Sequence, residues 1–172
     1  INGADLETEI PVTRVDGGAE RHESVQNGLA ALLYTPEFVA VHDGARPLIT
    51  AEQISRCIQT AREYGAAASA HPVTDTLKRA DKERFTIPEQ VERDGLWCME
   101  TPQVFQYPLL LDAYVEVTER NIQVTDEVTA LQLIGHPTRL VHNHEHNPKI
   151  TWPEDISRAE MLMDLKHLRN DS

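Results

Sequence analysis

The chain has 172 residues, 40% of them hydrophobic, which is enough to bury one ordinary core and short for two full domains. We therefore expect a single domain over residues 1–172. Sixteen Lys and Arg against 28 Asp and Glu give a formal charge of −12, which disfavours non-specific binding to nucleic acid or to anionic membranes. Any phosphate that the protein binds must therefore be met by a few placed cations.

The cysteine and leader signals indicate a cytoplasmic protein. Cys57 and Cys98 fit neither a metal-binding spacing nor a disulfide framework, which predicts reduced thiols. No charged leader precedes an apolar segment, and no stretch approaches the length of a membrane span. Residues 1–7 contain no Met and no clear period, so we expect the sequence to be a fragment.

The first elements are a turn, a helix and a strand. Polar and glycine residues at 16–21 predict the turn. Ser24 begins a pattern that places Val25, Leu29 and Leu32 on one helical face. Residues 38–42 are rich in β-forming side chains and bounded by turn residues, which predicts a short buried strand.

The best-marked helix follows Thr50. Thr50 and Gln53 form a capping box, and Gly65 provides a stop. Residues 66–70 and 73–78 are then predicted to be extended. The chain thus alternates between helical and extended segments.

The middle of the chain is polar and charged. It returns to apolar character at residues 95–97, which predicts a projecting hairpin or arm over about residues 74–97. Pro108 can begin another helix, and Asp126 lies where a further helix opens. Residues 139–142 are a candidate strand.

The last predicted helix has Pro153 near its first position, followed by acidic residues. Its spacing predicts that Ile156, Ala159 and Met163 face inward, with Met161 and Met163 filling the core. Trp152 is predicted to be a packing anchor. Strands that alternate with helices favour an α/β sheet.

The most informative run is HDGARP at residues 42–47, directly after the strand predicted at 38–42. In open α/β sheets, ligands bind at strand ends of this kind. Asp43 offers oxygen ligands for a divalent cation, and Arg46 offers a planar donor fork for phosphate. The alternative is a surface ion pair at the end of a strand.

Two other segments carry candidate binding groups, each with a plainer alternative. The double glycine at 17–18, before Ser24, offers backbone donors at a helix start, or it is a tight turn with Ser24 as an ordinary N-cap. Residues 74–79 offer hydroxyls and cations, or they form a solvated edge strand. Arg93 and Lys149, taken singly, are typical of solvated loop residues.

Alternate histidines form a competing candidate site. His142, His144 and His146 would project to one face of a strand and could bind zinc or another transition metal. The alternative is that they are solvated, because no fourth ligand is evident.

Taken together, the motifs resemble the 2-C-methyl-D-erythritol 4-phosphate cytidylyltransferase family. Seven motifs occur in the family's order, from about Val15 to the last helix, which is hard to obtain by chance. They are GGAERHESV at 17–25, HDGARP at 42–47, DTLKR at 75–79, RDGLW at 93–97, TPQVF at 101–105, TDE at 125–127 and KITWPED at 149–155.

The resemblance implies a Rossmann-like nucleotidyltransferase sheet with an arm that embraces a second subunit in a homodimer. It implies transfer of a cytidylyl group from CTP to the sugar-alcohol phosphate 2-C-methyl-D-erythritol 4-phosphate, with release of pyrophosphate and with Mg²⁺ as the divalent cation. The product, 4-diphosphocytidyl-2-C-methyl-D-erythritol, belongs to non-mevalonate isoprenoid biosynthesis.

The resemblance also assigns residues. It implies catalytic roles for Arg93, Lys149 and Asp43, with Asp43 touching the metal or the acceptor and Arg93 reaching the acceptor from the partner's arm. It implies substrate-binding roles for Gly18, Ser24, Gly44, Arg46, Thr76, Thr101 and Thr125. Gly18 and Ser24 would lie against the cytidine end of CTP, whereas Thr76, Thr101, Thr125 and Lys149 would shape the acceptor pocket.

One family feature is missing. The family opens with a strand and a glycine-rich loop of the type Pro-Ala-Ala-Gly-x-Gly-x-Arg followed by a lysine, and nothing in residues 1–16 matches it. Ala19 also replaces an acidic residue often found after the second glycine. We expect the carboxy-terminal part of such an enzyme, inactive alone. The alternatives are a ribitol 5-phosphate cytidylyltransferase and a catalytically dead homologue that acts as a binding module.

Overall fold

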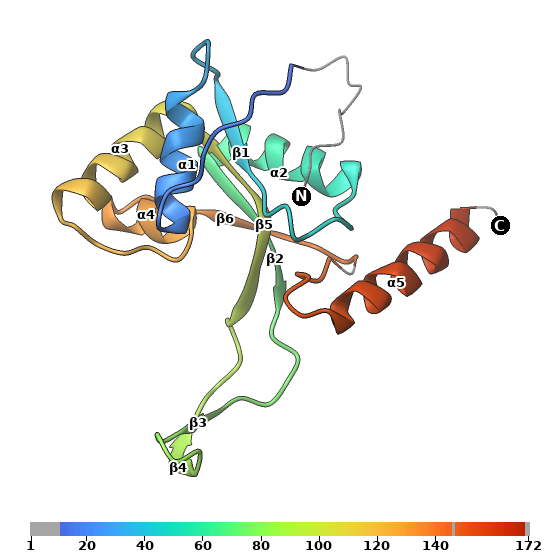
Figure 1. The fold of residues 1–172 in the computed structure, drawn as a ribbon. Coiled ribbons are helices and arrows are strands. Elements are labelled where there is room, and N and C mark those ends of the chain that lie inside the picture. Colours follow the sequence, from blue (N-terminus) through green and yellow to red (C-terminus); the bar gives the residue numbers. More distant parts are fainter. Residues whose placement is uncertain (1–10, 146, 171–172) are drawn as a thin grey trace. The chain divides into compact units, whose positions relative to one another are not determined.

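A computed structural model describes residues 11–145 and 147–170 (Figure 1). Contacts group them into two compact units. The first unit comprises the described part of Ile1–Glu37 and Tyr107–His136, and the second comprises Phe38–Gln106 and the described part of Pro137–Ser172. In chain order the elements are α1 (Arg21–Ala30), β1 (Phe38–Val41), α2 (Ala51–Tyr64), β2 (Ala66–Pro72), β3 (Lys78–Ala80), β4 (Thr86–Gln90), β5 (Trp97–Gln106), α3 (Tyr107–Glu119), α4 (Glu127–Leu133), β6 (Arg139–His142) and α5 (Glu154–Asn170).

The second unit is built on a four-stranded mixed sheet in the order β1-β5-β2-β6. Strand β5 runs antiparallel to both β1 and β2, whereas β2 and β6 are parallel. The carboxyl ends of β1, β2 and β6 therefore lie at the same edge of the sheet as the amino end of β5. This edge receives the loops that carry most of the predicted chemistry.

Helix α2 supplies the apolar cover of the sheet. Its buried Cys57 and Ala61 form one core cluster with Ala67, Val104 and Val141 of the strands. Burial raises the pKa of the Cys57 thiol to about 11, so the group stays protonated and packs as a small apolar side chain.

The predicted ends of α2 are confirmed. Thr50 is the N-cap, and its side chain accepts a hydrogen bond from the Gln53 backbone N–H at 3.2 Å. Gly65 ends the helix with φ of 82°, a left-handed conformation that glycine adopts without steric cost.

Strand β5 lies between β1 and β2 in the sheet, but the sequence did not predict it as a strand. Glu100, Thr101 and Gln103 are polar but buried, so the strand lacks the alternation that marks a half-buried strand. Pro102 has no backbone N–H, and it lies opposite a shift in register between Ala68 and Ala70 of β2.

Strand β1 confirms the predicted element at residues 38–42 but corrects its burial. Three of its four side chains are half-buried and one is exposed, rather than all being buried. The physical reason is its position, because in the described part of the chain β1 pairs with β5 alone.

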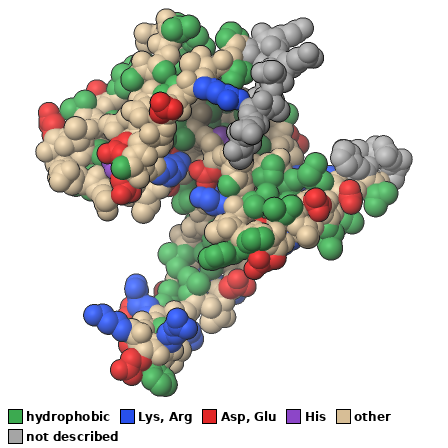
Figure 2. All heavy atoms as spheres, viewed as in Figure 1, with side chains coloured by type: hydrophobic (Ala, Val, Ile, Leu, Met, Phe, Trp, Pro, Cys, Tyr) green, Lys and Arg blue, Asp and Glu red, His purple; other side chains and the backbone are tan. Residues whose placement is uncertain are grey.

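The arm contains the two-stranded sheet β3-β4 at the end of the segments that leave β2 and β5 (Figure 1). Its strands are exposed, and Figure 2 shows Lys and Arg side chains gathered there. Arg79 pairs with Glu89 across the two strands at 2.9 Å. Of the residues 73–78, which were predicted to be extended, only Lys78 lies in a strand.

The first unit contains α1, α3 and α4. Helix α1 begins at Arg21, three residues before the predicted start at Ser24. It ends at Ala30, so Leu32, which was predicted on its apolar face, lies beyond the helix and is exposed. Its N-cap is Glu20, and Glu20 and Glu23 form a capping box that the sequence interpretation missed. The predicted starts of α3 and α4 are confirmed to within one residue of Pro108 and Asp126.

A buried carboxylate joins the three helices of this unit. Glu127 of α4 is fully buried and accepts two hydrogen bonds from the Arg21 guanidinium of α1, at 2.6 and 3.0 Å. The Tyr114 hydroxyl of α3 donates to it at 3.0 Å. Burial, followed by the Glu127 charge, raises the pKa of Tyr114 well above its usual range.

Helix α5 corrects two predictions. Ala159 is buried as expected, but Ile156 and Met163 are 50% and 46% exposed, and Met161 is 64% exposed. Figure 2 shows hydrophobic side chains along this helix. Trp152 is likewise exposed and is no packing anchor. No helix in residues 11–145 and 147–170 is long and apolar enough to cross a membrane.

Removal of the Glu127 carboxylate should destabilise the protein. Glu127→Ala leaves the Arg21 guanidinium and the Tyr114 hydroxyl without their acceptor, and we expect the free energy of unfolding to fall by about 3 kcal/mol. Glu116→Ala, which breaks the more exposed pair with Arg120, should cost less than about 1 kcal/mol. Urea denaturation followed by circular dichroism measures both, and equal losses would contradict the role given to Glu127.

Candidate functional site

Strand register gathers four segments at one edge of the sheet in the second unit. Val41 pairs with Gln103, so the loop after β1 begins beside the Thr101 end of β5. Ala70 pairs with His142, so the ends of β2 and β6 are neighbours. Residues that are far apart in the sequence are thereby brought to one place.

Asp43 lies at the centre of this edge. Its carboxylate is 3.3 Å from Lys149 Nζ and 3.6 Å from Arg46 Nε, and its side chain is 17% exposed. Its backbone N–H donates to the Thr101 hydroxyl at 3.0 Å. The Thr101 hydroxyl is also 2.9 Å from His42 Nδ1. The structure thus brings the predicted residues Asp43, Arg46, Thr101 and Lys149 together.

The guanidinium of Arg46 connects backbone segments. It donates to the Asn147 carbonyl at 2.8 Å and to the Met99 carbonyl at 3.3 Å. It therefore ties the loop after β1 to the start of β5 and to the segment that carries Lys149. In this arrangement Arg46 shapes the site, because two of its three nitrogens already have acceptors.

A polar hollow opens beside these residues, with a volume of about 590 Å³. Its charged lining has three cations and two carboxylates, namely Arg46, Lys149, Arg158, Glu100 and Glu145. The hollow therefore carries a formal excess of positive charge in a chain of net charge −12. Such a lining suits an anionic ligand.

Histidines also line this hollow. The rings of His142 and His144 lie 3.9 Å apart between centroids, and His142 makes an edge contact with Trp97 at 5.6 Å. Desolvation, followed by the charges of His144, Arg56 and His71, lowers the pKa of His142. Within residues 11–145 and 147–170 no group of three His, Cys, Asp or Glu side chains could hold a metal ion. His146, the third member of the predicted cluster, lies outside the described residues.

Thr76 and Arg93 line a different hollow, at the base of the arm. The Arg93 guanidinium donates to the Thr74 carbonyl. Thr74 lines the polar hollow described above, whereas Thr76 and Arg93 are absent from its lining. Within one chain, then, these two predicted residues are grouped with each other rather than with Asp43.

Gly18 and Ser24 come together in the first unit. The Gly18 N–H donates to the Ser24 hydroxyl at 3.0 Å, and the hydroxyl donates to the Glu20 carbonyl at 3.3 Å. A Cβ atom at Gly18 would lie 2.2 Å from Glu23 Cβ, so only glycine fits there. Gly44 differs, since a Cβ atom there would meet nothing within 4 Å.

Thr125 also belongs to the first unit. It is exposed just before α4, with its hydroxyl 3.3 Å from that of Thr129. The structure therefore divides the predicted residues between the two units, with Gly18, Ser24 and Thr125 in the first.

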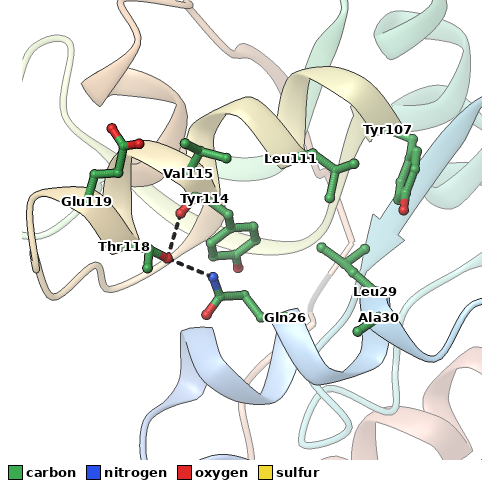
Figure 3. Close-up of a pocket in the computed structure, with 9 residues that line it drawn as sticks. All are labelled: Gln26, Leu29, Ala30, Tyr107, Leu111, Tyr114, Val115, Thr118 and Glu119. Atoms are coloured by element: carbon green, nitrogen blue, oxygen red, sulfur yellow. Dashed lines mark hydrogen bonds between the residues drawn. The ribbon is translucent and has the colours of Figure 1, made fainter.

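A third hollow, in the first unit, is mainly apolar and has a volume of about 480 Å³ (Figure 3). Leu29 of α1 and Leu111 and Tyr114 of α3 contribute to its lining. Gln26 donates to the Thr118 hydroxyl at 3.2 Å at one end. With Glu119 as its charged lining residue, this hollow is poorly suited to a phosphate.

Sequence reasoning missed several polar residues of the main site. Glu100, His71, Asn143 and Asn147 all line the polar hollow. One sequence signal could have indicated two of them, namely proximity to a family motif. Glu100 directly precedes TPQVF, and Asn147 lies two residues before KITWPED. The burial of Glu100, Asn143 and Asn147 depends on strand pairing, which local sequence does not reveal.

Known proteins resemble this chain over most of its length. The family described as "IspD: 2-C-methyl-D-erythritol 4-phosphate cytidylyltransferase" matches residues 2–165. The enzyme of that name from Alkaliphilus oremlandii is 42% identical over 149 residues, covering 87% of this chain and 63% of the relative. A bifunctional enzyme IspD/IspF from Desulfotalea psychrophila is 46% identical over 152 residues, covering 88% of this chain and 38% of the relative.

Solved structures show the same fold. The crystal structure of 2-C-methyl-D-erythritol 4-phosphate cytidylyltransferase from Thermus thermophilus has a TM-score of 0.76 and 31% identity, covering 91% of this chain and 77% of that chain. The Francisella tularensis enzyme has a TM-score of 0.78 and 28% identity, covering 86% and 70%. These likenesses confirm the predicted Rossmann-like nucleotidyltransferase sheet.

The match is partial in length, since the chain spans 63% and 65% of two of the curated relatives. It nevertheless includes all seven motifs, from GGAERHESV to KITWPED. The chain belongs to the 2-C-methyl-D-erythritol 4-phosphate cytidylyltransferase family.

Proposed function

We propose that this chain is part of an enzyme that transfers a cytidylyl group from CTP to 2-C-methyl-D-erythritol 4-phosphate. The products are 4-diphosphocytidyl-2-C-methyl-D-erythritol and pyrophosphate, which places the reaction in non-mevalonate isoprenoid biosynthesis. The observation that carries the proposal is the pair of Asp43 and Lys149, 3.3 Å apart beside a polar hollow of positive lining. Both residues lie in motifs of the family.

The proposed chemistry needs alignment and charge neutralisation more than a protein base. The acceptor phosphate is itself the nucleophile that attacks the α-phosphorus of CTP, so its oxygen forms the new bond while pyrophosphate leaves. Lys149 would bind this phosphate through its ammonium group, which is half exposed to the hollow. Arg46 and Thr101 would hold the loops that align Asp43 and Lys149.

Magnesium fits the donor set at Asp43. Proteins bind Mg²⁺ through one or two carboxylates together with substrate phosphates and water, and Asp43 offers one such carboxylate at the edge of the hollow. When bound, the ion offsets the negative charge of the triphosphate. In the structure this carboxylate pairs with the Lys149 ammonium group at 3.3 Å.

The remaining residue roles extend the same proposal. Gly18 and Ser24 would contact the cytidine end of CTP, with Gly44 beside the substrates, and Thr76 and Thr125 would shape the acceptor pocket. Arg93 would reach that pocket from the arm of the partner subunit in a homodimer. The exposed strands of the arm and the grouping of Arg93 with Thr76 support a role between subunits.

A cytoplasmic location completes the proposal. The structure has two free cysteines, Cys57 and Cys98, and free thiols are typical of reducing compartments.

Acceptor choice tests the proposed reaction. We expect the product of the complete coding sequence, with CTP and Mg²⁺, to release pyrophosphate faster with methylerythritol phosphate than with ribitol 5-phosphate, and not without an acceptor. Coupled detection of pyrophosphate measures the rates. Faster reaction with ribitol 5-phosphate would assign the other acceptor, and CTP binding without turnover would indicate a dead homologue.

Lys149→Ala should impair acceptor use selectively. The loss of a charge-assisted hydrogen bond to phosphate predicts a fall in kcat/KM for the acceptor of roughly 10- to 100-fold. The KM for CTP should change less than about threefold, since the lysine contacts the other substrate. Arg62→Ala, which removes one exposed positive charge from α2, is the control. Equal losses for both substrates would count against the assignment.

Mixed dimers test whether Arg93 acts on the partner. If it does, Arg93→Ala and Lys149→Ala subunits, each impaired alone, should regain activity when combined, because one site per mixed dimer then has both native residues. Recovery approaches about one quarter of the wild-type rate in an equal mixture. Absence of recovery, with mixed dimers verified by native mass spectrometry, would place Arg93 in its own subunit's site.

A further inference from the structure

A buried carboxylate lies beneath the polar hollow and outside the roles assigned above. Glu100 of β5 is 4% exposed. Its Oε2 accepts hydrogen bonds from the Asn143 amide at 2.8 Å and from the Ser69 hydroxyl at 3.1 Å. Its Oε1 lies 2.9 Å from His71 Nδ1. Three donor groups from β2 and from the segment after β6 thus converge on one carboxylate.

Other hydrogen bonds of Ser69 and Asn143 determine that both side chains donate to Glu100. The Gln53 amide donates to the Ser69 hydroxyl at 3.1 Å and to the Val141 carbonyl at 3.1 Å, so the Ser69 hydroxyl is the donor in its hydrogen bond to Glu100. The side-chain Oδ1 of Asn143 accepts from the Glu145 backbone N–H at 3.1 Å, so the side-chain Nδ2 of Asn143 faces Glu100. Both neutral donors are therefore held in place.

This network selects one tautomer of His71. An ionised carboxylate only accepts hydrogen bonds, so the proton of the His71–Glu100 contact belongs to Nδ1. In the neutral ring, Nε2 then carries a lone pair and points away from Glu100. The imidazole is 45% exposed and lines the polar hollow.

The hollow already has cations for a phosphate. Lys149 and Arg158 line it together with Arg46. In the neutral form of the ring, a phosphate oxygen would meet the Nε2 lone pair as acceptor against acceptor, which is unfavourable, whereas a hydroxyl group would donate to it. The geometry therefore favours a ligand that carries hydroxyl groups as well as a phosphate.

We propose that His71, held by Glu100, is a specificity-determining residue that accepts a hydrogen bond from a hydroxyl group of a polyol phosphate bound in the hollow. His71 contacts the ligand, and Glu100 is a positioning residue that acts through it. The inference rests on the proposed function, since it concerns the acceptor of that reaction, but its test is independent of cytidylyl transfer.

Binding measurements without CTP provide the first test. Calorimetry with ribitol 5-phosphate, methylerythritol phosphate and inorganic phosphate compares ligands with and without hydroxyl groups. We expect His71→Ala to weaken binding of at least one polyol phosphate by about fivefold, which is the loss of one neutral hydrogen bond, and of inorganic phosphate by less than about twofold. The matched control is His22→Ala, which removes an imidazole from α1 in the other unit.

Other patterns overturn the inference. Equal weakening of polyol phosphates and inorganic phosphate would mean that the ring contacts the phosphate. Unchanged affinities with a lowered midpoint of thermal unfolding would mean that the pair is structural only. If no polyol phosphate binds to the wild-type protein, the proposed class of ligand is wrong.

Nitrogen-15 NMR of the histidines provides a second test, and its first part uses only the wild-type protein. In wild-type protein His71 should show the Nδ1–H tautomer when neutral, and a bound polyol phosphate should shift its Nε2 resonance. Glu100→Gln should reduce that tautomer and weaken polyol phosphate binding, and it should have no further effect in a His71→Ala background.

An Nε2–H tautomer in the wild type, or additive effects of the two substitutions, would contradict the positioning role of Glu100. Failure of cytidylyl transfer with normal His71-dependent binding would instead contradict the proposed function alone.

Discussion

The pairing of β5 between β1 and β2 is the constraint on which the rest of the site depends. The antiparallel ladders place Thr101 beside the loop that carries Asp43 and place Glu100 beside the end of β2. The parallel pairing of β2 with β6 then brings the chain towards Lys149. A shift of register by one residue would turn these side chains to the other face of the sheet.

The site places one carboxylate close to two cations, which would otherwise repel each other. Asp43 balances Lys149 and approaches Arg46, while Arg46 satisfies two backbone carbonyls of the surrounding loops. A second layer at Glu100 is held by neutral donors and one imidazole. The first layer, with Lys149 and Arg46, thus suits a phosphate. In the second layer, Glu100 orients the His71 ring, which we propose accepts a hydrogen bond from a hydroxyl group.

Much of the fold could be predicted from local signals. The capping residues Thr50 and Asp126, the stop at Gly65 and the β-forming run at residues 139–142 act within a few positions of the chain. The missed features have non-local causes. Strand β5 is polar and contains Pro102 but is buried by its neighbours, and Met163 has helical spacing but remains exposed.

The sequence by itself determined the family, because seven short motifs occur in the order that the family has. It also indicated Asp43, Arg46 and Lys149 as residues of one site. Only the tertiary structure decided that Arg46 braces loops, that Arg93 is grouped with Thr76, and that Glu100 holds His71. The physical reason is that hydrogen-bond partners and burial arise from strand pairing between distant segments, which no local pattern encodes.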